Sequence, residues 1–355
     1  MYMVNIKDVA REAGVSISTV SRVMNDTKAV SDELRKKVED AIDVLGYRTN
    51  CVAQSLKNSK THKIAVILTS VSRTFFTSVL DGINEAAARY GYTVLIAETH
   101  DDLETEMDLV YSFQSQWVDG IILASSAYGN SPKTLSYIEH LGQLEKKGHR
   151  IPVVTLEFSL GNPNIDAVVV DYEAASYEAV SYLLRLGYRK IAHVSLPDNH
   201  LIGQMRFEGY KRAHEEFGIE FDDDHIISGN YTTYSGYQIV KGLITGRHTF
   251  DSIYCANDQM AVGALKACDE LNVRVPEEMA IVGNDDIFAA SIVTPSLTSI
   301  HVPKREMGEV AMQRIHDLLE NSNLDRGKVI TLPTSFVERE STVRGAKGNL
   351  RYLEW

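Results

Sequence analysis

The sequence has 355 residues, of which 44% are hydrophobic and 24% charged, and its formal net charge is −12. This length predicts two or three domains at roughly 100–200 residues each, and the composition is that of a globular chain. No apolar run approaches the ~18 residues of a membrane-spanning helix, and the N-terminus has no apolar signal-peptide segment. Cys51, Cys255 and Cys268 are too far apart for a CxxC motif. We therefore expect a cytoplasmic protein with no membrane partner.

The net charge is distributed unevenly along the chain. Residues 1–60 carry ten Lys and Arg against eight Asp and Glu, so this segment is +2 and the remaining residues are −14. A mildly positive head on an acidic body is suited to contact DNA with one end only. Charge scattered over solvated helices is the simpler interpretation, so other features have to decide between the two.

Three short helices are predicted within residues 1–46. Asn5 and Ser16 are suited to cap the first two, which only Gly14-Val15 separates, and such a short connection is typical of a helix-turn-helix. Ser31 is expected to cap a third helix that ends at Gly46. The apolar residues at helical spacing are Ile6, Val9, Ala10 and Ala13, then Ile17, Val20, Val23 and Met24, then Leu34, Val38, Ala41, Ile42 and Leu45.

Residues 47–62 form a polar connector with one helical turn predicted around Val52 to Leu56. Beyond it, buried strands alternate with amphipathic helices, as in parallel sheets that are covered on both faces. Ten strands are too many for one such sheet. The predicted strands are 64–68, 93–97, 120–124, 153–158, 167–170, 191–195, 226–228, 252–256, 280–283 and 297–302, and the predicted helices include 79–90, 174–186, 204–217 and 260–271. The fold class is therefore a small all-α helix-turn-helix head plus an α/β core of two doubly wound parallel-sheet subdomains.

The string from Asn5 to Asn25, NIKDVAREAGVSISTVSRVMN, resembles the DNA-binding head of the lactose/galactose repressor (LacI/GalR) family. Further similar segments follow in the family's order, and so many in register make the resemblance specific. It covers nearly the whole chain. These segments are Val30-Ser31, Leu45–Tyr47, Asn50–Leu56, Ala256–Ala261, Val282–Asp286, Pro295–Thr298, Met307-Gly308 and Leu332–Thr342.

The resemblance implies a head at residues 1–48, a hinge helix and linker at 49–62, a core at 63–345 and a tail at 346–355. The core is expected to be similar to periplasmic binding proteins of type I. One subdomain is expected to comprise about 63–160 plus 292–325, and the other about 161–291 plus 326–345. The chain ends without the apolar heptads of the family's tetramer-forming coiled coil, so we expect a homodimer.

The second helix has the side chains that DNA recognition needs. Arg22 can donate two hydrogen bonds to a guanine edge, and small hydroxyls let the helix end approach phosphates. The alternative is that Ile17 and Val20 only join the core and that Arg22 is only a solvated charge. In the resembled family the hinge leucine, here Leu56, inserts into the minor groove and kinks the duplex. The expected DNA-contacting residues are Asn5, Ser16, Ile17, Ser18, Thr19, Ser21, Arg22, Asn25, Asn50, Ala53, Gln54 and Leu56.

Polar side chains follow several predicted strands, where a ligand cleft is expected. Carboxylate, amide, guanidinium and aromatic groups together suit a sugar or a nucleoside. In the resembled family Arg206, Asn257 and Asp285 fall at effector-contacting positions, although capping of a strand or helix explains any one of them alone. The family's Asn-Pro is replaced here by Arg73-Thr74. The expected effector-contacting residues are Phe75, Phe76, Ser125, Glu157, Arg206, Tyr231, Asn257 and Asp285.

The resemblance thus predicts a transcriptional repressor that binds near-palindromic operator DNA as a homodimer and responds to a small-molecule effector, a sugar or related metabolite. One alternative is a sugar-binding receptor, which the basic head and the missing signal peptide oppose. Another is a catabolite-control regulator that responds to a phosphorylated carrier protein, which 170–173 and 209–213 fit, whereas Arg206 favours a small ligand. The sequence has no catalytic motif and no paired metal-ligand histidines, so no enzyme activity, metal or cofactor is expected.

Overall fold

The computed structural model describes residues 4–25, 30–47, 60–197, 200–221, 223–246 and 249–346. The chain divides into two compact units between Thr61 and His62. The predicted hinge residues Asn50, Ala53, Gln54 and Leu56 lie outside the described residues, as do residues 347–355 of the predicted tail. Within the described ranges, every helix is too short or too polar to span a lipid bilayer.

The N-terminal unit consists of the three predicted helices, α1 (Ile6–Glu12), α2 (Ile17–Asn25) and α3 (Asp32–Leu45). Asn5 caps α1, because its side chain accepts a hydrogen bond from the Lys7 N–H at 2.9 Å. The hydroxyl of Ser16 accepts one from the Thr19 N–H at 3.1 Å at the start of α2. Ser31 precedes α3 but makes no side-chain capping bond, unlike the prediction. All three helices contribute to one small core of Val9, Ala10, Val20, Val23, Val38 and Ala41.

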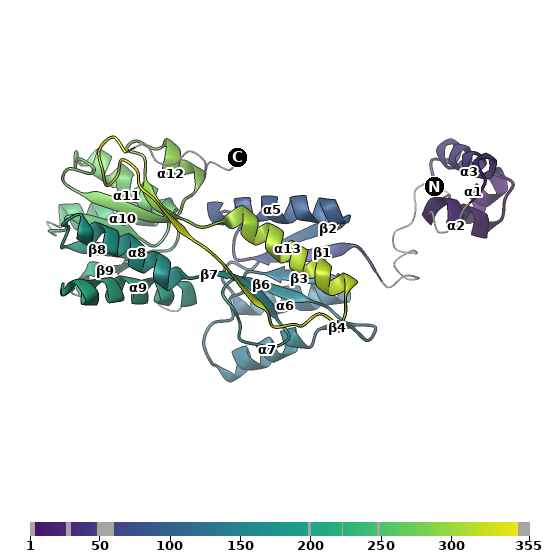
Figure 1. Ribbon diagram of the computed structural model, residues 1–355, viewed down its shortest axis with the longest axis horizontal. Coiled ribbons are helices and arrows are strands. Elements are labelled where there is room, and N and C mark those ends of the chain that lie inside the picture. Colours follow the sequence, from purple (N-terminus) through teal and green to yellow (C-terminus); the bar gives the residue numbers. More distant parts are fainter. Residues whose placement is uncertain are drawn as a thin grey trace. The chain divides into compact units, whose positions relative to one another are not determined.

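The second unit contains two six-stranded sheets flanked by helices (Figure 1). The first sheet has strands β1 (Lys63–Leu68), β2 (Thr93–Glu98), β3 (Gly120–Leu123), β6 (Val153–Glu157), β7 (Asp166–Val170) and β13 (Val329–Leu332). The second has β8 (Ile191–Ser195), β9 (Ile226–Ser228), β10 (Ser252–Cys255), β11 (Ala280–Asp285), β12 (Thr298–His301) and β14 (Ser335–Val337). A separate hairpin pairs β4 (Glu145–Lys146) with β5 (His149–Arg150). All ten predicted strands are confirmed, each within two residues of its predicted bounds.

Helices cover the sheets and connect their parallel strands. The order of the first sheet is β13-β7-β6-β3-β1-β2, and that of the second is β14-β12-β11-β10-β8-β9. Every residue of β3, β8 and β10 is buried, which explains their continuous apolar runs. The first subdomain carries α5 (Thr74–Tyr90), α6 (Leu103–Ser115), α7 (Pro132–Gly142) and α13 (Lys304–Glu320). The second carries α8 (Tyr172–Arg185), α9 (Leu201–Phe217), the 3-10 turn η1 (Asp223–His225), α10 (Thr233–Thr245), α11 (Asp258–Glu270) and α12 (Phe288–Ile292).

The boundaries between the two subdomains differ from the predicted ones, because three strands belong to the other sheet than expected. Strand β7, predicted in the second subdomain, lies in the first sheet between β6 and β13. Strand β12, predicted in the first subdomain, pairs with β11 in the second sheet. Strand β13 lies in the range 326–345 predicted for the second subdomain, but it pairs with β7 in the first sheet. The chain passes between the sheets after β7, after β12 and again between β13 and β14, where the yellow C-terminal segment runs from one sheet to the other (Figure 1). Each subdomain is therefore built from separate parts of the sequence.

Helices α5 and α13 lie side by side at very close range, because glycines face each other's backbone (Figure 1). A Cβ atom on Gly308 would lie 2.1 Å from the Val79 carbonyl oxygen, and one on Gly82 would lie 2.0 Å from that of Arg305. Both contacts are with backbone atoms, so a side chain at either position would force the helices apart.

Gly308→Ala is therefore expected to lower the free energy of unfolding by about 1–3 kcal/mol, the usual cost of overpacking. Gly242→Ala on α10 is the matched control, because no atom lies within 4 Å of the added Cβ. That change is expected to raise stability by about 0.4–1 kcal/mol, since alanine restricts the unfolded chain. Urea unfolding of both variants measures the difference. Equal effects at the two positions would contradict the close helix contact.

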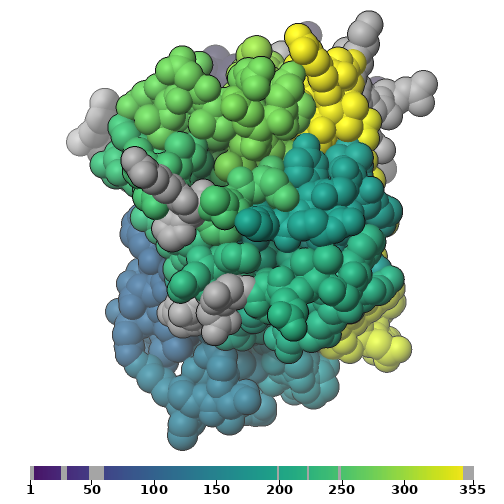
Figure 2. Space-filling model, turned by 90° about the vertical axis from the view of Figure 1, so that its left-hand side faces the viewer, coloured from purple at the N-terminus to yellow at the C-terminus, as the bar shows by residue number. Residues whose placement is uncertain are grey.

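The second subdomain dominates one face of the core. In Figure 2, teal and green atoms of residues 170–290 cover the upper part of the viewed face, and the blue atoms of the first subdomain lie below them.

The carboxyl ends of β6, β10 and β11 carry Glu157, Asn257 and Asp285, which line one pocket with residues of the β1–α5 segment. The ligand cleft expected at strand ends therefore lies between the two subdomains.

Candidate functional site

The first candidate site is the exposed surface of α2 in the N-terminal unit. Ser16, Ile17, Ser18 and Arg22 are exposed there, whereas Val20 on the opposite side is fully buried. Ile17 is 44% exposed, so it does not join the core of this unit. The alternative interpretation, in which both residues only join the core, is therefore correct for Val20 but not for Ile17. An exposed apolar side chain beside an arginine and several hydroxyls suits contact with base edges and phosphates.

Hydroxyl groups form a small network at the N-terminus of α2. The Ser16 hydroxyl lies 2.7 Å from that of Ser18 and 2.8 Å from that of Thr19. These side chains are short, so a phosphate can approach the backbone N–H groups of the first helical turn. Thr19 and Ser21 are half-buried, so the exposed predicted contacts are Asn5, which also caps α1, and Ser16, Ile17, Ser18 and Arg22.

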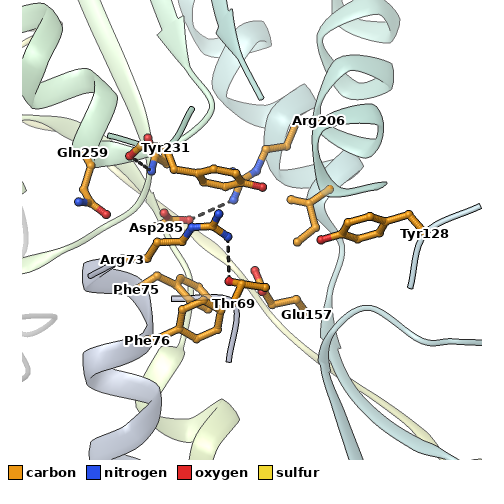
Figure 3. Close-up of a pocket in the computed structure, with 12 residues that line it drawn as sticks. Thr69, Arg73, Phe75, Phe76, Tyr128, Glu157, Arg206, Tyr231, Gln259 and Asp285 are labelled. Carbon is orange, nitrogen blue, oxygen red and sulfur yellow. Dashed lines mark hydrogen bonds and ion pairs between the residues drawn. The ribbon is translucent and has the colours of Figure 1, made fainter. Parts of the chain in front are cut away.

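The second candidate site is a narrow pocket between the two subdomains of the core (Figure 3). It has a volume of about 30 Å³. Seven of the eight predicted effector residues line it, namely Phe75, Phe76, Glu157, Arg206, Tyr231, Asn257 and Asp285. Thr69, Arg73, Tyr128, Ile202 and Gln259 also line it and were not predicted. Thr69 could have been predicted from its position at a strand end, because it directly follows β1.

A buried ion pair forms one wall of the pocket. The Arg206 guanidinium donates to Asp285 Oδ1 at 3.1 Å and also bonds the carbonyl oxygen of Ala256. It lies over the ring of Tyr172, 4.6 Å from the ring centroid. Arg206 is only 3% exposed, and its Nε has no hydrogen-bond partner among the described residues. A buried donor without a partner is rare in native proteins, and Arg206 lines the pocket, so this donor is available to a ligand group.

Glu157 supplies a second carboxyl group, and opposing effects of its surroundings set its pKa. Burial raises its pKa to about 7, although the Arg206 charge and a hydrogen bond from the Tyr172 hydroxyl at 3.0 Å lower it. Near neutral pH the carboxyl is therefore present both with and without its proton. It can donate a hydrogen bond to a ligand in one form and accept one in the other.

Three pocket residues have backbone conformations that are unfavourable for residues other than glycine. The φ angles of Glu157, Tyr231 and Asp285 are 71°, 70° and 110°. Each such residue costs on the order of 1–3 kcal/mol, and this strain is typical of functional sites. The backbone therefore turns just where these side chains enter the pocket.

Tyr231 and Asn257 hold each other in the second subdomain. Asn257 caps α11 by accepting a hydrogen bond from the Met260 N–H at 3.0 Å, and its amide donates to the Tyr231 carbonyl oxygen at the same distance. The Tyr231 hydroxyl lies 2.8 Å from His200 Nδ1. Capping, the simpler interpretation of Asn257, is thus correct, and the residue lines the pocket as well.

Ser125 is the predicted effector residue that does not line the pocket. Its hydroxyl donates to Glu106 Oε1 at 2.7 Å, and Glu106 also accepts a hydrogen bond from the Tyr137 hydroxyl at 2.9 Å. Burial raises the pKa of the Glu106 carboxyl. The strand end at Ser125 therefore belongs to a buried polar cluster with α6 and α7.

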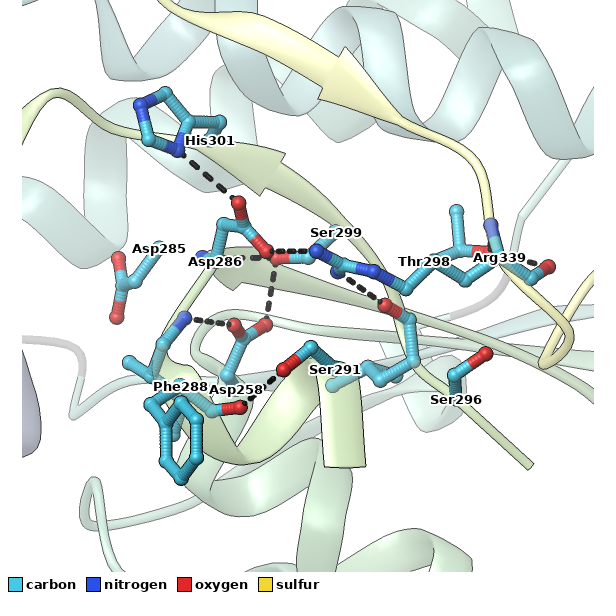
Figure 4. Close-up of polar contacts among 12 residues, drawn as sticks. Asp258, Asp285, Asp286, Phe288, Ser291, Ser296, Thr298, Ser299, His301 and Arg339 are labelled. Carbon is cyan, nitrogen blue, oxygen red and sulfur yellow. Dashed lines mark hydrogen bonds and ion pairs between the residues drawn. The ribbon is translucent and has the colours of Figure 1, made fainter. Parts of the chain in front are cut away.

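A second polar network fixes the corner that presents Asp285 (Figure 4). Arg339 pairs with Asp286 Oδ1 at 2.7 Å, and His301 Nδ1 lies 3.0 Å from Asp286 Oδ2. Asp258 accepts hydrogen bonds from the Ser299 hydroxyl at 2.7 Å and the Ile287 N–H at 2.8 Å. Asp286 and Arg339 are therefore structural residues, although they lie within motifs that the sequence singles out.

Two family models match the two units. Residues 5–50 match the model described as bacterial regulatory proteins of the lacI family. Residues 61–340 match the one described as periplasmic binding proteins and sugar binding domain of the LacI family. The chain is 34% identical to the transcriptional regulator RegA of Clostridium saccharobutylicum, over 96% of this chain and 99% of the relative. It is also 34% identical to catabolite control protein A of Priestia megaterium, over 96% of this chain and 99% of that protein.

The fold is also similar to a solved repressor. The lac repressor dimer bound to operator and the anti-inducer ONPF has 28% sequence identity, and the TM-score is 0.84. The match covers 96% of this chain and 99% of the repressor chain. It confirms the predicted head and two-subdomain core. The chain belongs to the LacI family of bacterial regulatory proteins.

Proposed function

We propose that this protein is a cytoplasmic transcriptional repressor, without enzyme activity, that binds near-palindromic operator DNA as a homodimer. A small polar effector, such as a sugar or related metabolite, binds in the cleft and controls DNA binding. The observation that carries the ligand site is the buried Arg206–Asp285 pair, because its guanidinium retains an unused donor beside the pocket. The similarity to the lac repressor, which was solved with operator and anti-inducer, supports both parts.

The pocket suits a polar ligand without a strong charge. Arg73 and Arg206 offset Glu157 and Asp285, so its charged side chains nearly cancel. Tyr231, Phe75 and Phe76 add aromatic surface for the flat face of a ring. A thermal-shift screen of sugars and nucleobases tests this site, because a ligand at 100 times its Kd stabilises the protein by about 2.7 kcal/mol.

Exposed apolar residues support assembly of two chains. Ile96 lies on β2 at the edge of the first sheet, and Phe288 and Ile292 lie on α12 of the second subdomain; all three are exposed in the single chain. Exposed apolar side chains of this kind are suited to a contact between two copies of the chain about a twofold axis. Light scattering that found a monomer at micromolar concentration would contradict this assembly.

A catabolite-control regulator that responds to a phosphorylated carrier protein is the second candidate. The similarity to catabolite control protein A favours it, whereas the intact polar pocket favours a small ligand. The thermal-shift screen separates the two when the phosphorylated carrier protein is added to the set of small molecules. Stabilisation by a small molecule supports the first candidate, and stabilisation only by the phosphorylated carrier supports the second.

Arg22→Ala tests the DNA-reading role of α2. Its affinity for an operator, selected from a random DNA pool with the wild-type protein, is expected to fall by about 1–3 kcal/mol, because a paired contact to one base is lost. Affinity for random DNA is expected to change far less. Arg11→Ala on α1 is the control, since this exposed arginine pairs with Asp8 within the head. An equal loss of affinity for the operator and for random DNA would mean that Arg22 contacts only a phosphate.

A further inference from the structure

Arg73 reaches into the cleft from the first subdomain, where it precedes α5 (Figure 3). Its guanidinium donates to the Thr69 hydroxyl at 2.8 Å and forms an ion pair with Asp101. Both partners belong to the first subdomain. The guanidinium also lies over the Tyr231 ring, 3.6 Å from the ring centroid. Tyr231 follows β9 in the second subdomain, so this contact crosses the cleft.

The same turn makes a second contact across the cleft. The Thr74 N–H donates a hydrogen bond to Gln259 Oε1 at 3.2 Å, and Gln259 lies on α11 of the second subdomain. A cation over an aromatic ring contributes more when water is excluded, and the Arg73 side chain is only 16% exposed. The contact of Arg73 with Tyr231 and the hydrogen bond from Thr74 to Gln259 are here called the Arg73 bridge. They connect the two subdomains across the pocket.

The Arg73 bridge takes the space that a ligand would need. With the guanidinium on Tyr231, the pocket volume is about 30 Å³. That volume holds a few water molecules, whereas ligand pockets usually measure roughly 300–1,000 Å³. The aromatic face that would stack on a ligand is already covered, by a flat group that also bonds a carboxylate and a hydroxyl.

We propose that Arg73 is an internal occupant of the effector cleft: it holds the two subdomains together, and an effector binds by displacing it from Tyr231. This inference rests on the proposed effector site. It also limits the chemistry of the effector. Displacement leaves Asp101 without its cation, and the other oxygen of Asp101 already has no hydrogen-bond partner among the described residues. An effector therefore has to bring a flat face to Tyr231 and hydrogen-bond donors to Asp101.

The distance between the subdomains tests the bridge directly in the full chain. Spin labels are attached at Leu135→Cys on α7 and Tyr234→Cys on α10, where both native side chains are exposed. Cys51→Ser removes one native thiol, and Cys255 and Cys268 are buried. Labelled chains are mixed with excess unlabelled chains, so that distances within one chain dominate. Wild-type protein is expected to give one short distance, and Arg73→Ala a longer and broader distribution.

Two controls distinguish occupation of the cleft from a general loss of structure. Arg89→Ala, at the far end of α5, is expected to keep the wild-type distance. Millimolar ethylguanidine is expected to restore the short distance in Arg73→Ala and to leave wild-type protein unchanged, because it supplies the missing planar group. Thermal unfolding checks that each variant is folded.

Two outcomes would overturn the inference. One is an unchanged distance in Arg73→Ala, and the other is a longer distance that ethylguanidine does not shorten. The measurement uses neither DNA nor an effector. Failure to bind operator DNA would therefore refute the proposed repressor function without affecting this result.

Discussion

Asp285→Ala is expected to lower the free energy of unfolding by about 3–5 kcal/mol, because it leaves the buried Arg206 guanidinium without its carboxylate. Arg206 lies 3.1 Å from Asp285 and is almost fully buried. The loss is larger than for an exposed pair, since water cannot replace the missing partner. Urea unfolding followed by circular dichroism measures the change. A loss below about 1 kcal/mol would indicate that water reaches Arg206, as it does in surface pairs.

Asp285→Asn separates the ligand role of this residue from its structural role. The amide keeps an oxygen that accepts from Arg206 and removes only the charge, so this variant is expected to retain more stability than Asp285→Ala. Affinity for an effector found by the thermal-shift screen is expected to fall in the folded Asp285→Asn protein, because a charged acceptor is lost. Calorimetric titration measures it. Unchanged affinity would mean that Asp285 serves the fold alone.

Arg314→Ala is the second change with a large expected effect, again about 3–5 kcal/mol of unfolding free energy. Arg314 on α13 forms a buried ion pair with Asp166 and also bonds the Asp325 carbonyl oxygen. Asp166 accepts a further hydrogen bond from the Lys328 N–H at 2.9 Å, next to β13. Loss of Arg314 leaves the Asp166 carboxylate buried with too few partners.

The control for this change is Arg89→Ala. Arg89 is 57% exposed and lies 4.0 Å from Glu309, so its pair is expected to contribute about 0–1 kcal/mol. Urea unfolding of the two variants under one set of conditions gives the comparison. If Arg314→Ala were as mild as Arg89→Ala, the pairing of β13 with β7 would not depend on this buried ion pair.

The strands of the core could be predicted because central parallel strands are buried on both faces. Their apolar runs are continuous, and the predicted bounds are accurate to two residues. The sheet edges were predicted less completely: the edge strands β2 and β9 were predicted, whereas β13, on which Val329 and Thr331 are exposed, and β14 were not. The predicted subdomain of β7, β12 and β13 was wrong because sheet assignment depends on contacts between distant residues, such as Asp166 and Arg314.

Several pocket residues could also be predicted from the strands, because they lie at strand ends. The one residue that was predicted wrongly is Ser125, because its partner is distant in the sequence. Glu157 and Asp285 end strands and Asn257 follows one, and the ends of parallel strands meet at one edge. Ser125 also follows a strand, but the buried Glu106 carboxylate on α6 binds it instead. The role of Arg73 depends on Tyr231 across the cleft, and no local pattern in the sequence shows that contact.

The late pairing of β13 with β7 has a consequence for synthesis of the chain. Strand β7 ends at Val170, and its neighbour β13 ends at Leu332. A ribosome adds roughly 5–20 residues per second, so this edge of β7 stays unpaired for roughly 8–30 s after it has been made. The segment Asp166–Val170 contains three consecutive valines, and an open apolar edge pairs readily with other chains. The nascent chain is therefore most prone to aggregation before its last strands leave the ribosome.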